Sequence, residues 1–156
     1  MKEEVPSHDQ AGTANFLPHR GAMCLVREFL EFDRSNEHAL LRFTLKSDMV
    51  CARPDGSLDT TWYVEILAQA AAALFYFQSG GSGKPRMGFL VGIEEMDIAD
   101  DQMTLGESIL VSAKMITEFY PFGVYEVSAR KGDVTTARGE FRFMVHPTHD
   151  TGLSAA

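Results

Sequence analysis

The sequence feature that most constrains this chain is a long stretch of strong helix formers, residues 60–77, without glycine or proline. Asp59 and Thr61 offer cap oxygens at its start, and a Ser-Gly-Gly run at 79–81 gives it a clear end. The stretch is apolar on nearly every side, which is typical of a buried helix. It is also too short and too closely bounded by polar residues to span a membrane. We therefore expect one buried helix at the centre of the fold.

Two polar side chains, Glu65 and Gln69, interrupt this apolar helix. Being four positions apart, they share one face. A capping box does not explain Glu65, because the residue three positions earlier is Trp62 rather than Ser or Thr. Two interpretations remain: a structural ion pair with an Arg or Lys, or a reactive carboxylate facing a pocket. In the second, burial is expected to raise the pKa of Glu65.

The hydrophobic pattern predicts strands on both sides of the helix. Two strands come before it and four after it: 23–33, 38–46, 87–98, 107–120, 124–130 and 134–145. Short turns between them imply an antiparallel sheet, and one sheet with one buried helix is an α+β architecture in which the curved sheet wraps around the helix. We expect a single domain over residues 16–146, with flexible tails at 1–15 and 147–156. Open sheet edges favour pairing with a second chain, as a homodimer or with a similar chain.

Composition narrows the function classes. The net charge of -8 argues against a nucleic-acid partner. The two cysteines, Cys24 and Cys51, match neither a disulfide framework nor a metal-ligand set, and no phosphate-binding glycine loop is present, so we expect no cofactor and no metal. The N-terminal residues lack the apolar run of a signal peptide, so we expect a cytoplasmic protein that binds no membrane.

The strand order with this helix resembles the hot-dog fold, and three motifs resemble those of the 3-hydroxyacyl-acyl-carrier-protein dehydratases of fatty acid biosynthesis. The motifs are Leu-Pro-His-Arg at 17–20, Glu-x-x-x-Gln with Ala68 at 65–69, and Phe-Leu-Val-Gly-Ile at 89–93. The resemblance runs from about Phe16 to Val145. It implies a dimeric enzyme that removes water from a 3-hydroxyacyl thioester carried on acyl-carrier protein or coenzyme A.

One departure from that family stands out. Those dehydratases carry a Gly-His-Phe-Pro segment before the helix, whereas the corresponding place here is near Cys51, and no histidine lies between His38 and His146. The pattern is more similar to a divergent dehydratase-like branch associated with aryl-polyene and related specialised lipid clusters. Some members of that branch are thought to work as one half of a heterodimer.

Dehydration requires a base, an acid and hydrogen-bond donors for the thioester carbonyl. Glu65, near the first turns of a buried helix, is the candidate acid–base residue. The resemblance brings His19 beside the pocket, where it is the candidate replacement for the missing base; a structural turn histidine is the alternative. Cys51 is a candidate nucleophile or a small apolar residue. The residues expected to bind substrate are Gln69, Gly92, Cys51 and Trp62.

Two other functions remain open. A hot-dog thioesterase would use Glu65 to activate water or to attack the thioester, and needs no histidine. A non-catalytic acyl-binding subunit would complete the dimer of another dehydratase. Four basic residues near loops would steer an acidic carrier protein or simply add soluble charge: Arg20, Arg53, Lys84 and Arg86.

Overall fold

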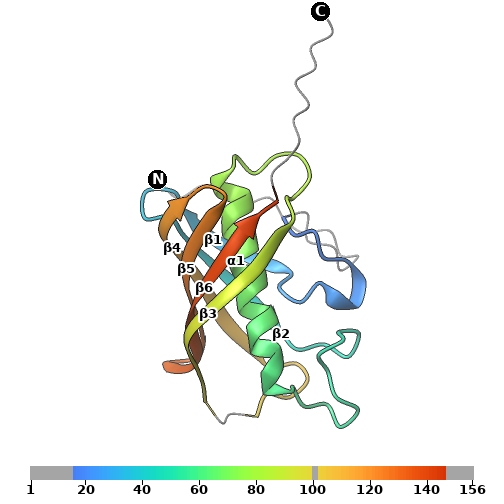
Figure 1. Cartoon of the computed structure of the whole chain (residues 1–156). Coiled ribbons are helices and arrows are strands. Elements are labelled where there is room, and N and C mark those ends of the chain that lie inside the picture. Colours follow the sequence, from blue (N-terminus) through green and yellow to red (C-terminus); the bar gives the residue numbers. More distant parts are fainter. Residues whose placement is uncertain (1–15, 100–101, 147–156) are drawn as a thin grey trace, which may run out of the picture.

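A computed structural model describes residues 16–99 and 102–146, so the tails expected at 1–15 and 147–156 lie outside the described residues. The long apolar stretch forms helix α1 (Tyr63–Gln78), which lies against the concave face of a single sheet (Figure 1). A short 3-10 turn, η2 (Thr60–Trp62), leads into it, and Asp59 caps this turn by accepting a hydrogen bond from the backbone N–H of Thr61 at 3.0 Å. Within the described ranges, no helix has both the length and the apolar character needed to cross a membrane.

The sheet has six antiparallel strands in the order β1-β2-β4-β5-β6-β3. Their bounds are β1 (Glu28–Asp33), β2 (His38–Thr44), β3 (Gly88–Ile98), β4 (Ser108–Phe119), β5 (Phe122–Lys131) and β6 (Val134–Val145). The expected succession of two strands, one helix and four strands is thus confirmed. The strand after the helix, β3, lies at one edge of the sheet beside β6.

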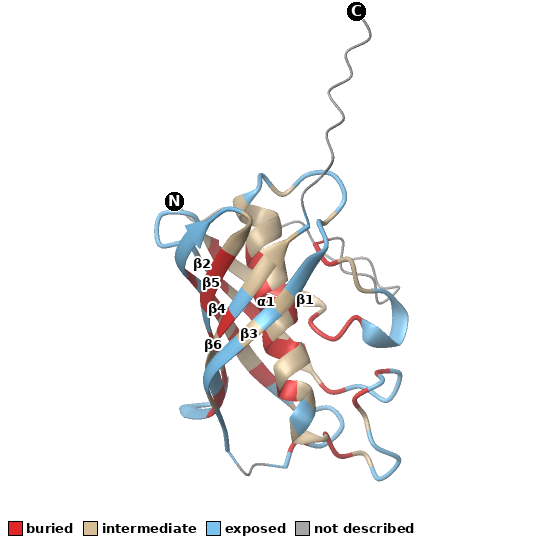
Figure 2. Cartoon of the chain, in the orientation of Figure 1, coloured by how far each residue is buried: buried red, intermediate tan, exposed pale blue. Residues whose placement is uncertain are grey.

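The core lies between α1 and the inner face of the sheet. Ile66, Leu67 and Leu74 of α1 are fully buried there. Figure 2 shows buried segments concentrated along α1 and the middle of the sheet, whereas β3 is mostly exposed. On β3 the side chains of Phe89 and Val91 remain 43% and 52% exposed. This edge of the sheet therefore carries apolar surface that residues 16–99 and 102–146 do not cover.

The strand predicted at 23–33 begins later than expected. Residues Gly21–Met23 form the 3-10 turn η1, and β1 starts only at Glu28. The backbone in between bonds to a side chain instead of a strand: the N–H groups of Leu25 and Val26 donate to the side-chain oxygen of Gln69. The sequence from Met23 to Val26 is therefore fastened to α1 rather than to the sheet.

Candidate active site

Gln69 is the anchor of the site. Its side chain is fully buried. Its Oε1 accepts hydrogen bonds from the N–H groups of Leu25 at 2.9 Å and Val26 at 3.2 Å. Its Nε2 donates to the carbonyl of Met23 at 2.7 Å and to Glu65 Oε1 at 3.0 Å. Because these four bonds use both donors and both lone pairs of the amide, its orientation is fixed and one N–H is aimed at Glu65.

His19 supplies the second donor to the same carboxylate oxygen. Its Nε2 lies 3.2 Å from Glu65 Oε1, and the two side chains are 28% and 33% exposed. Oε1 of Glu65 is thus held by two groups, while Oε2 has no hydrogen-bond partner among the described residues. His19 Nδ1 is buried and also lacks a partner in this part of the chain. The arrangement fixes the carboxylate and leaves one of its oxygens available for chemistry.

The backbone around His19 is held by its neighbour. The guanidinium of Arg20 donates from Nη1 to the carbonyl of His19 at 2.8 Å and to that of Leu17. Pro18 restricts Leu17 to an extended conformation. The Leu-Pro-His-Arg sequence therefore builds a tight local structure that presents the His19 ring to α1.

The pKa of Glu65 differs from the sequence-based expectation. The hydrogen bond from His19 lowers it below its ordinary value; burial opposes this shift, and the hydrogen bond from Gln69 adds to it. The prediction that burial would raise this pKa is therefore wrong. It considered desolvation alone, whereas two donors on Oε1 favour the charged form more strongly than partial burial disfavours it. Glu65 is consequently ionised near neutral pH and suited to accept a proton.

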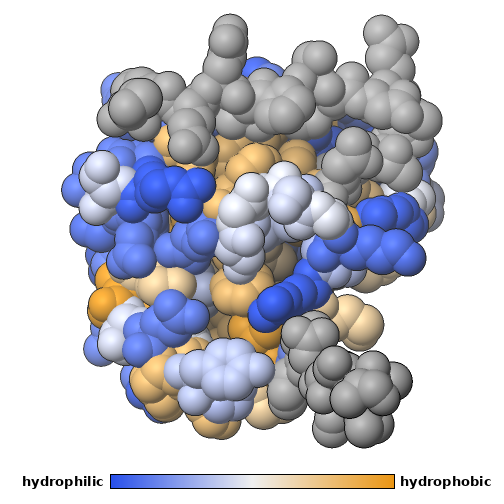
Figure 3. Space-filling view, turned by 90° about the horizontal axis from the view of Figure 1, so that it is seen from above, coloured by the Kyte–Doolittle hydropathy of each residue, from blue (hydrophilic) through white to orange (hydrophobic). Residues whose placement is uncertain are grey.

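Glu65 and His19 line a pocket of about 160 Å³. From Glu65 the pocket follows one face of α1 past Ala68 and Ala72 to Phe75, which is about 15 Å further along the helix axis. The opposite wall is aromatic, with rings from β5, β6 and the β4–β5 connection: Tyr120, Phe122, Tyr125 and Phe143. Seen from the end of the molecule where α1 stops, apolar surface lies between polar side chains (Figure 3). The pocket is thus lined mainly by apolar side chains, with Glu65 at the first turn of α1.

None of the four residues expected to bind substrate lines this pocket. Gln69 is fully buried and is connected to the pocket only through its hydrogen bond to Glu65, while Gly92, Cys51 and Trp62 lie elsewhere. Gly92 follows a register shift in β3 after Leu90 and lies against the side chain of Arg142, in a shallow groove with Val91. The bulge breaks the alternation that would have placed Gly92 on the same face as Leu90.

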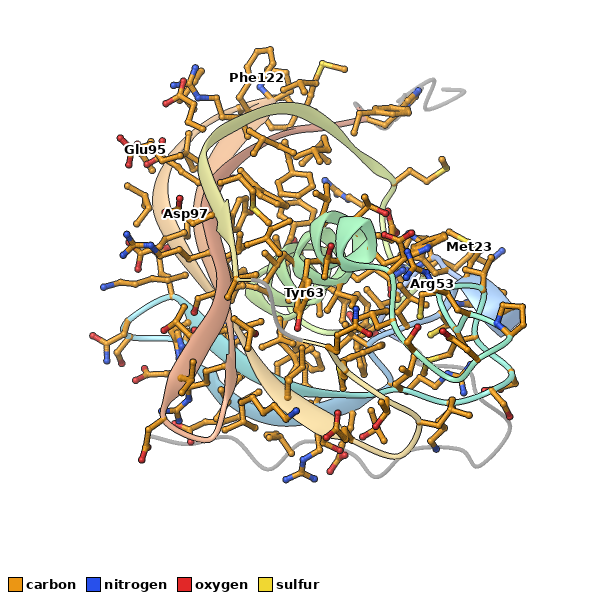
Figure 4. The ribbon with its side chains drawn as sticks, turned by 90° about the horizontal axis from the view of Figure 1, so that it is seen from below. Met23, Arg53, Tyr63, Glu95, Asp97 and Phe122 are labelled. Atoms are coloured by element: carbon orange, nitrogen blue, oxygen red, sulfur yellow. The ribbon has the colours of Figure 1, made fainter. Side chains whose placement is uncertain are left out.

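The other two belong to the packing around the helix start. Cys51 is buried in the core, and burial raises the pKa of its thiol to about 11, so it is not a nucleophile at neutral pH. Trp62 packs against the core at the end of η2. Viewed from below, Figure 4 shows Met23 and Arg53 beyond one side of α1, and Glu95 and Asp97 pointing outward from β3 on the other.

Of the four basic residues near loops that were considered for steering a carrier protein, Arg86 lines the pocket. Arg53 instead donates to Asp59 at 2.8 Å, and Arg20 binds backbone carbonyls. The individual residues of the aromatic wall could not be picked out from the sequence, although Tyr125 and Phe143 both fall on alternating strands; alternation does not reveal which face meets a pocket. Among residues 16–99 and 102–146, no group of three or more His, Cys, Asp or Glu side chains is placed to hold a metal ion.

Comparison with solved structures shows the hot-dog fold predicted from the sequence. The dehydratase heterocomplex ApeI:P from Xenorhabdus doucetiae matches with a TM-score of 0.73 and 19% identity, over 86% of this chain and 90% of that one. A hypothetical thioesterase with coenzyme A from Streptococcus pneumoniae TIGR4 matches with a TM-score of 0.58 and 9% identity, over 76% and 84%. The protein smu.793 from Streptococcus mutans UA159, bound to acetyl CoA, matches with a TM-score of 0.58 and 10% identity, over 83% and 91%.

Comparison with functionally curated proteins finds no match. The family model for ApeP-like proteins, described as ApeP dehydratase, matches residues 12–152 and so includes the whole described domain with the Glu65–His19 pair. The chain belongs to the ApeP-like dehydratase family.

Proposed function

We propose that this protein is a dehydratase that removes water from 3-hydroxyacyl thioesters in fatty acid or specialised lipid and polyene biosynthesis, with Glu65 as its acid–base residue. The observation that carries the proposal is the state of the Glu65 carboxylate. Oε1 is held by His19 at 3.2 Å and by Gln69 at 3.0 Å, while Oε2 has no described partner and the side chain lines an apolar pocket. Membership of a dehydratase family supports this reaction class.

In the proposed reaction the Glu65–His19 pair starts with one proton, on His19. Glu65 Oε2 takes the proton from C2 of the acyl group, the electron pair of that bond forms the C2=C3 double bond, and the C3–O bond breaks. His19 gives its proton to the departing hydroxyl, which leaves as water. Glu65 then releases the C2 proton from Oε2 and His19 regains one, with the water formed in the reaction carrying it between them, which restores the starting pair.

The remaining residues act on position rather than on protons. Gln69 keeps Oε1 directed at His19, so that Oε2 is the oxygen presented to the substrate. The alanine face of α1 and the facing aromatic rings give the acyl chain an apolar path away from the reacting carbons. Such positioning restricts the substrate to geometries close to the one that reacts.

The proposed substrate carrier is an acyl-carrier protein, or coenzyme A, in the cytoplasm. Arg86 at the pocket is suited to attract an acidic carrier. We also propose that the protein works as a dimer, with itself or with another hot-dog chain. Its free β3 edge and the exposed Phe89 and Val91 support this, and the matched ApeI:P structure is a heterocomplex.

The decisive experiment is mass spectrometry of a 3-hydroxyacyl-carrier thioester after incubation with the protein or with Glu65→Gln. This substitution keeps the size of the side chain and removes its ability to accept a proton. Loss of one water with the wild type and not with Glu65→Gln is the expected result. An unchanged substrate with correctly folded wild type, alone and with a co-purifying hot-dog partner, would refute the proposal.

Thioester hydrolysis is the second candidate. It is favoured by the matched thioesterase structure with coenzyme A and by the free Oε2 atom, which is equally able to activate water. The same mass spectra separate the two, since hydrolysis releases a free acid while dehydration keeps the thioester. A protein that binds acyl groups and restores water loss only in its partner would be a non-catalytic subunit.

A further inference from the structure

Tyr125 places a hydroxyl in the pocket that the proposed chemistry does not use. The residue lies on β5, is only 3% exposed and lines the pocket. Its ring packs edge-on against Phe143, with ring centroids 5.7 Å apart. A Cβ on Gly123 would come within 2.9 Å of the ring, so the glycine is needed for this ring position. Neighbours on two sides thus hold the ring in place.

The hydroxyl of Tyr125 forms no hydrogen bond with any described residue. By contrast, the hydroxyl of the half-buried Tyr76 donates a hydrogen bond to the carbonyl of Gly81 at 3.0 Å. The residue as a whole is buried, but its hydroxyl oxygen keeps some exposure, and the pocket is the space that Tyr125 borders. Where such a group borders a pocket, a ligand atom is the natural partner. Phenylalanine would fill the same space without a polar group at the pocket wall, so the hydroxyl calls for a functional reason.

This hydroxyl lies far from the reacting end of the pocket. Tyr125 pairs across the sheet with Met115, whose sulfur lies 3.7 Å from the side chain of Gln78, the last residue of α1. Glu65 is in the first turn of the same helix. Given the rise per residue of a helix, Glu65 and Phe75, the last residue of α1 in the pocket lining, are about 15 Å apart. Tyr125 therefore does not reach the carbons on which Glu65 acts.

The hydroxyl remains a donor at physiological pH. Burial raises the pKa of Tyr125 well above its ordinary value, and the charges of Glu118 and Glu37 raise it further. The lining between Tyr125 and Glu65 includes only apolar side chains along α1, such as Ala68 and Ala72. Apart from His19, the lining residues with a side-chain donor are Tyr125, Tyr120 and Arg86, and of these only Tyr125 is buried.

We propose that the Tyr125 hydroxyl is a substrate-binding subsite. It donates a hydrogen bond to an oxygen atom of the substrate molecule that lies far from the thioester group and from the carbons that react. The inference rests on the proposed function in one respect: the pocket holds a thioester with its reacting end at Glu65. Two parts of such a substrate carry an oxygen at this distance. One is an amide carbonyl of the pantetheine arm, and the other is an oxygen on the far part of the acyl chain.

Calorimetric binding to the full chain tests the subsite without turnover. The first ligand is a long saturated acyl group joined to pantetheine through an amide, which can neither lose water nor be hydrolysed. The second has the same acyl group on an arm cut back to remove the distal amide. The third has this short arm and an acyl chain ending in a hydroxyl. Each is titrated into the wild type, Tyr125→Phe and Tyr120→Phe.

Tyr120→Phe is the matched control, because Tyr120 lines the same pocket but is 65% exposed. We expect Tyr125→Phe to weaken binding about three- to tenfold, the usual range for one lost hydrogen bond, and Tyr120→Phe to change it less than about twofold. Weakening with the first ligand alone identifies the arm as the source of the oxygen. Weakening with the third ligand alone identifies the acyl chain.

Equal affinities of wild type and Tyr125→Phe for all three ligands would overturn the subsite, as would equal weakening by both substitutions. Failure of the wild type to bind any of them would overturn it as well. These results are separate from a failure of the proposed function, which would appear as tight binding of the first ligand without water loss from a 3-hydroxyacyl thioester.

Discussion

Both faces of α1 are apolar, but one packs into the core and the other borders the pocket. On the core face, Leu67 and Leu74 are fully buried and their side chains fill the space beneath the sheet. On the pocket face, Ala68 and Ala72 are only half-buried and border a pocket of about 160 Å³. A helix that is apolar all round therefore need not be packed all round. Large side chains on one face provide stability, and small ones on the other leave room for a ligand.

The largest expected effect comes from the core face. Leu67→Ala should lower the free energy of unfolding by about 2–5 kcal/mol, because it removes apolar contacts and leaves a cavity. Phe75→Ala, on the pocket face, removes a larger side chain yet should cost less, since Phe75 already borders the pocket. Urea denaturation of both variants measures the difference. Equal losses would mean that the pocket face contributes to stability as the core face does.

Filling the pocket should affect activity more than stability. Ala72 lies about 10 Å along the helix from Glu65, and Ala72→Leu would add side-chain volume within the pocket. We expect kcat/KM for long acyl chains to fall about tenfold or more, with short chains spared and the free energy of unfolding changed by about 1 kcal/mol at most. Steady-state rates with acyl groups of increasing length are the measurement. A loss that is the same for every length would mean that the acyl chain does not pass Ala72.

Much of this comparison could be predicted from the sequence, because periodicity reports secondary structure directly. Glu65 and Gln69 were placed on one face from their spacing alone, and the 3.0 Å hydrogen bond between them agrees with it. The succession of strands along the chain and the buried helix were predicted from the same kind of pattern. The sequence does not show which alanines of α1 are packed, since Ala70 in the core and Ala72 at the pocket look alike.

Details that depend on distant segments could not be predicted. The pKa of Glu65 reflects a balance between burial and a hydrogen bond from His19, which belongs to a segment far away in the chain. Gly92 left the expected site because of a bulge in β3, which has no clear mark in the sequence. For Glu65 the missing information is a contact with a distant residue, and for Gly92 it is the register of a strand. Hydrophobic periodicity shows neither.

A smaller effect on activity should come from Arg20, which lies outside α1 and holds the backbone of His19 beside the pocket. Arg20 binds the carbonyls of Leu17 and His19, so it is a positioning residue for the His19 ring. Arg20→Ala should lower kcat about three- to tenfold with KM little changed, whereas Arg20→Ala added to His19→Ala should have no further effect. Steady-state kinetics of the four proteins gives the coupling directly. Arg53→Ala, which removes an exposed ion pair with Asp59, is the control.

Independent losses in the Arg20 and His19 variants would contradict this positioning role. Multiplied effects would show that Arg20 acts on the substrate or its carrier by its charge, without passing through His19. A strong salt dependence of the Arg20→Ala effect would point the same way, because screening weakens a steering charge more than a short hydrogen bond to a carbonyl.

The smallest effect concerns stability and pH. The pKa of Glu65 is lower in the folded protein than its ordinary value of 4.5, mainly through the hydrogen bond from His19. The unfolded chain therefore binds more protons around pH 4, and this carboxylate stabilises the fold fully above about pH 5, with the stabilisation lost as pH falls through the folded pKa. Because Glu65 is 33% exposed, we expect at most about 1 kcal/mol.

Urea denaturation of the wild type and Glu65→Gln at pH 6 and pH 3 checks this sign. The wild type should gain stability relative to Glu65→Gln at pH 6, and this advantage should shrink at pH 3. In the His19→Ala background the largest cause of the lowered pKa is absent and burial opposes Gln69 alone, so the advantage should shrink at pH 6 too or change sign. An advantage that grows toward pH 3 would mean that burial dominates and that the pKa of Glu65 in the folded protein lies above its ordinary value.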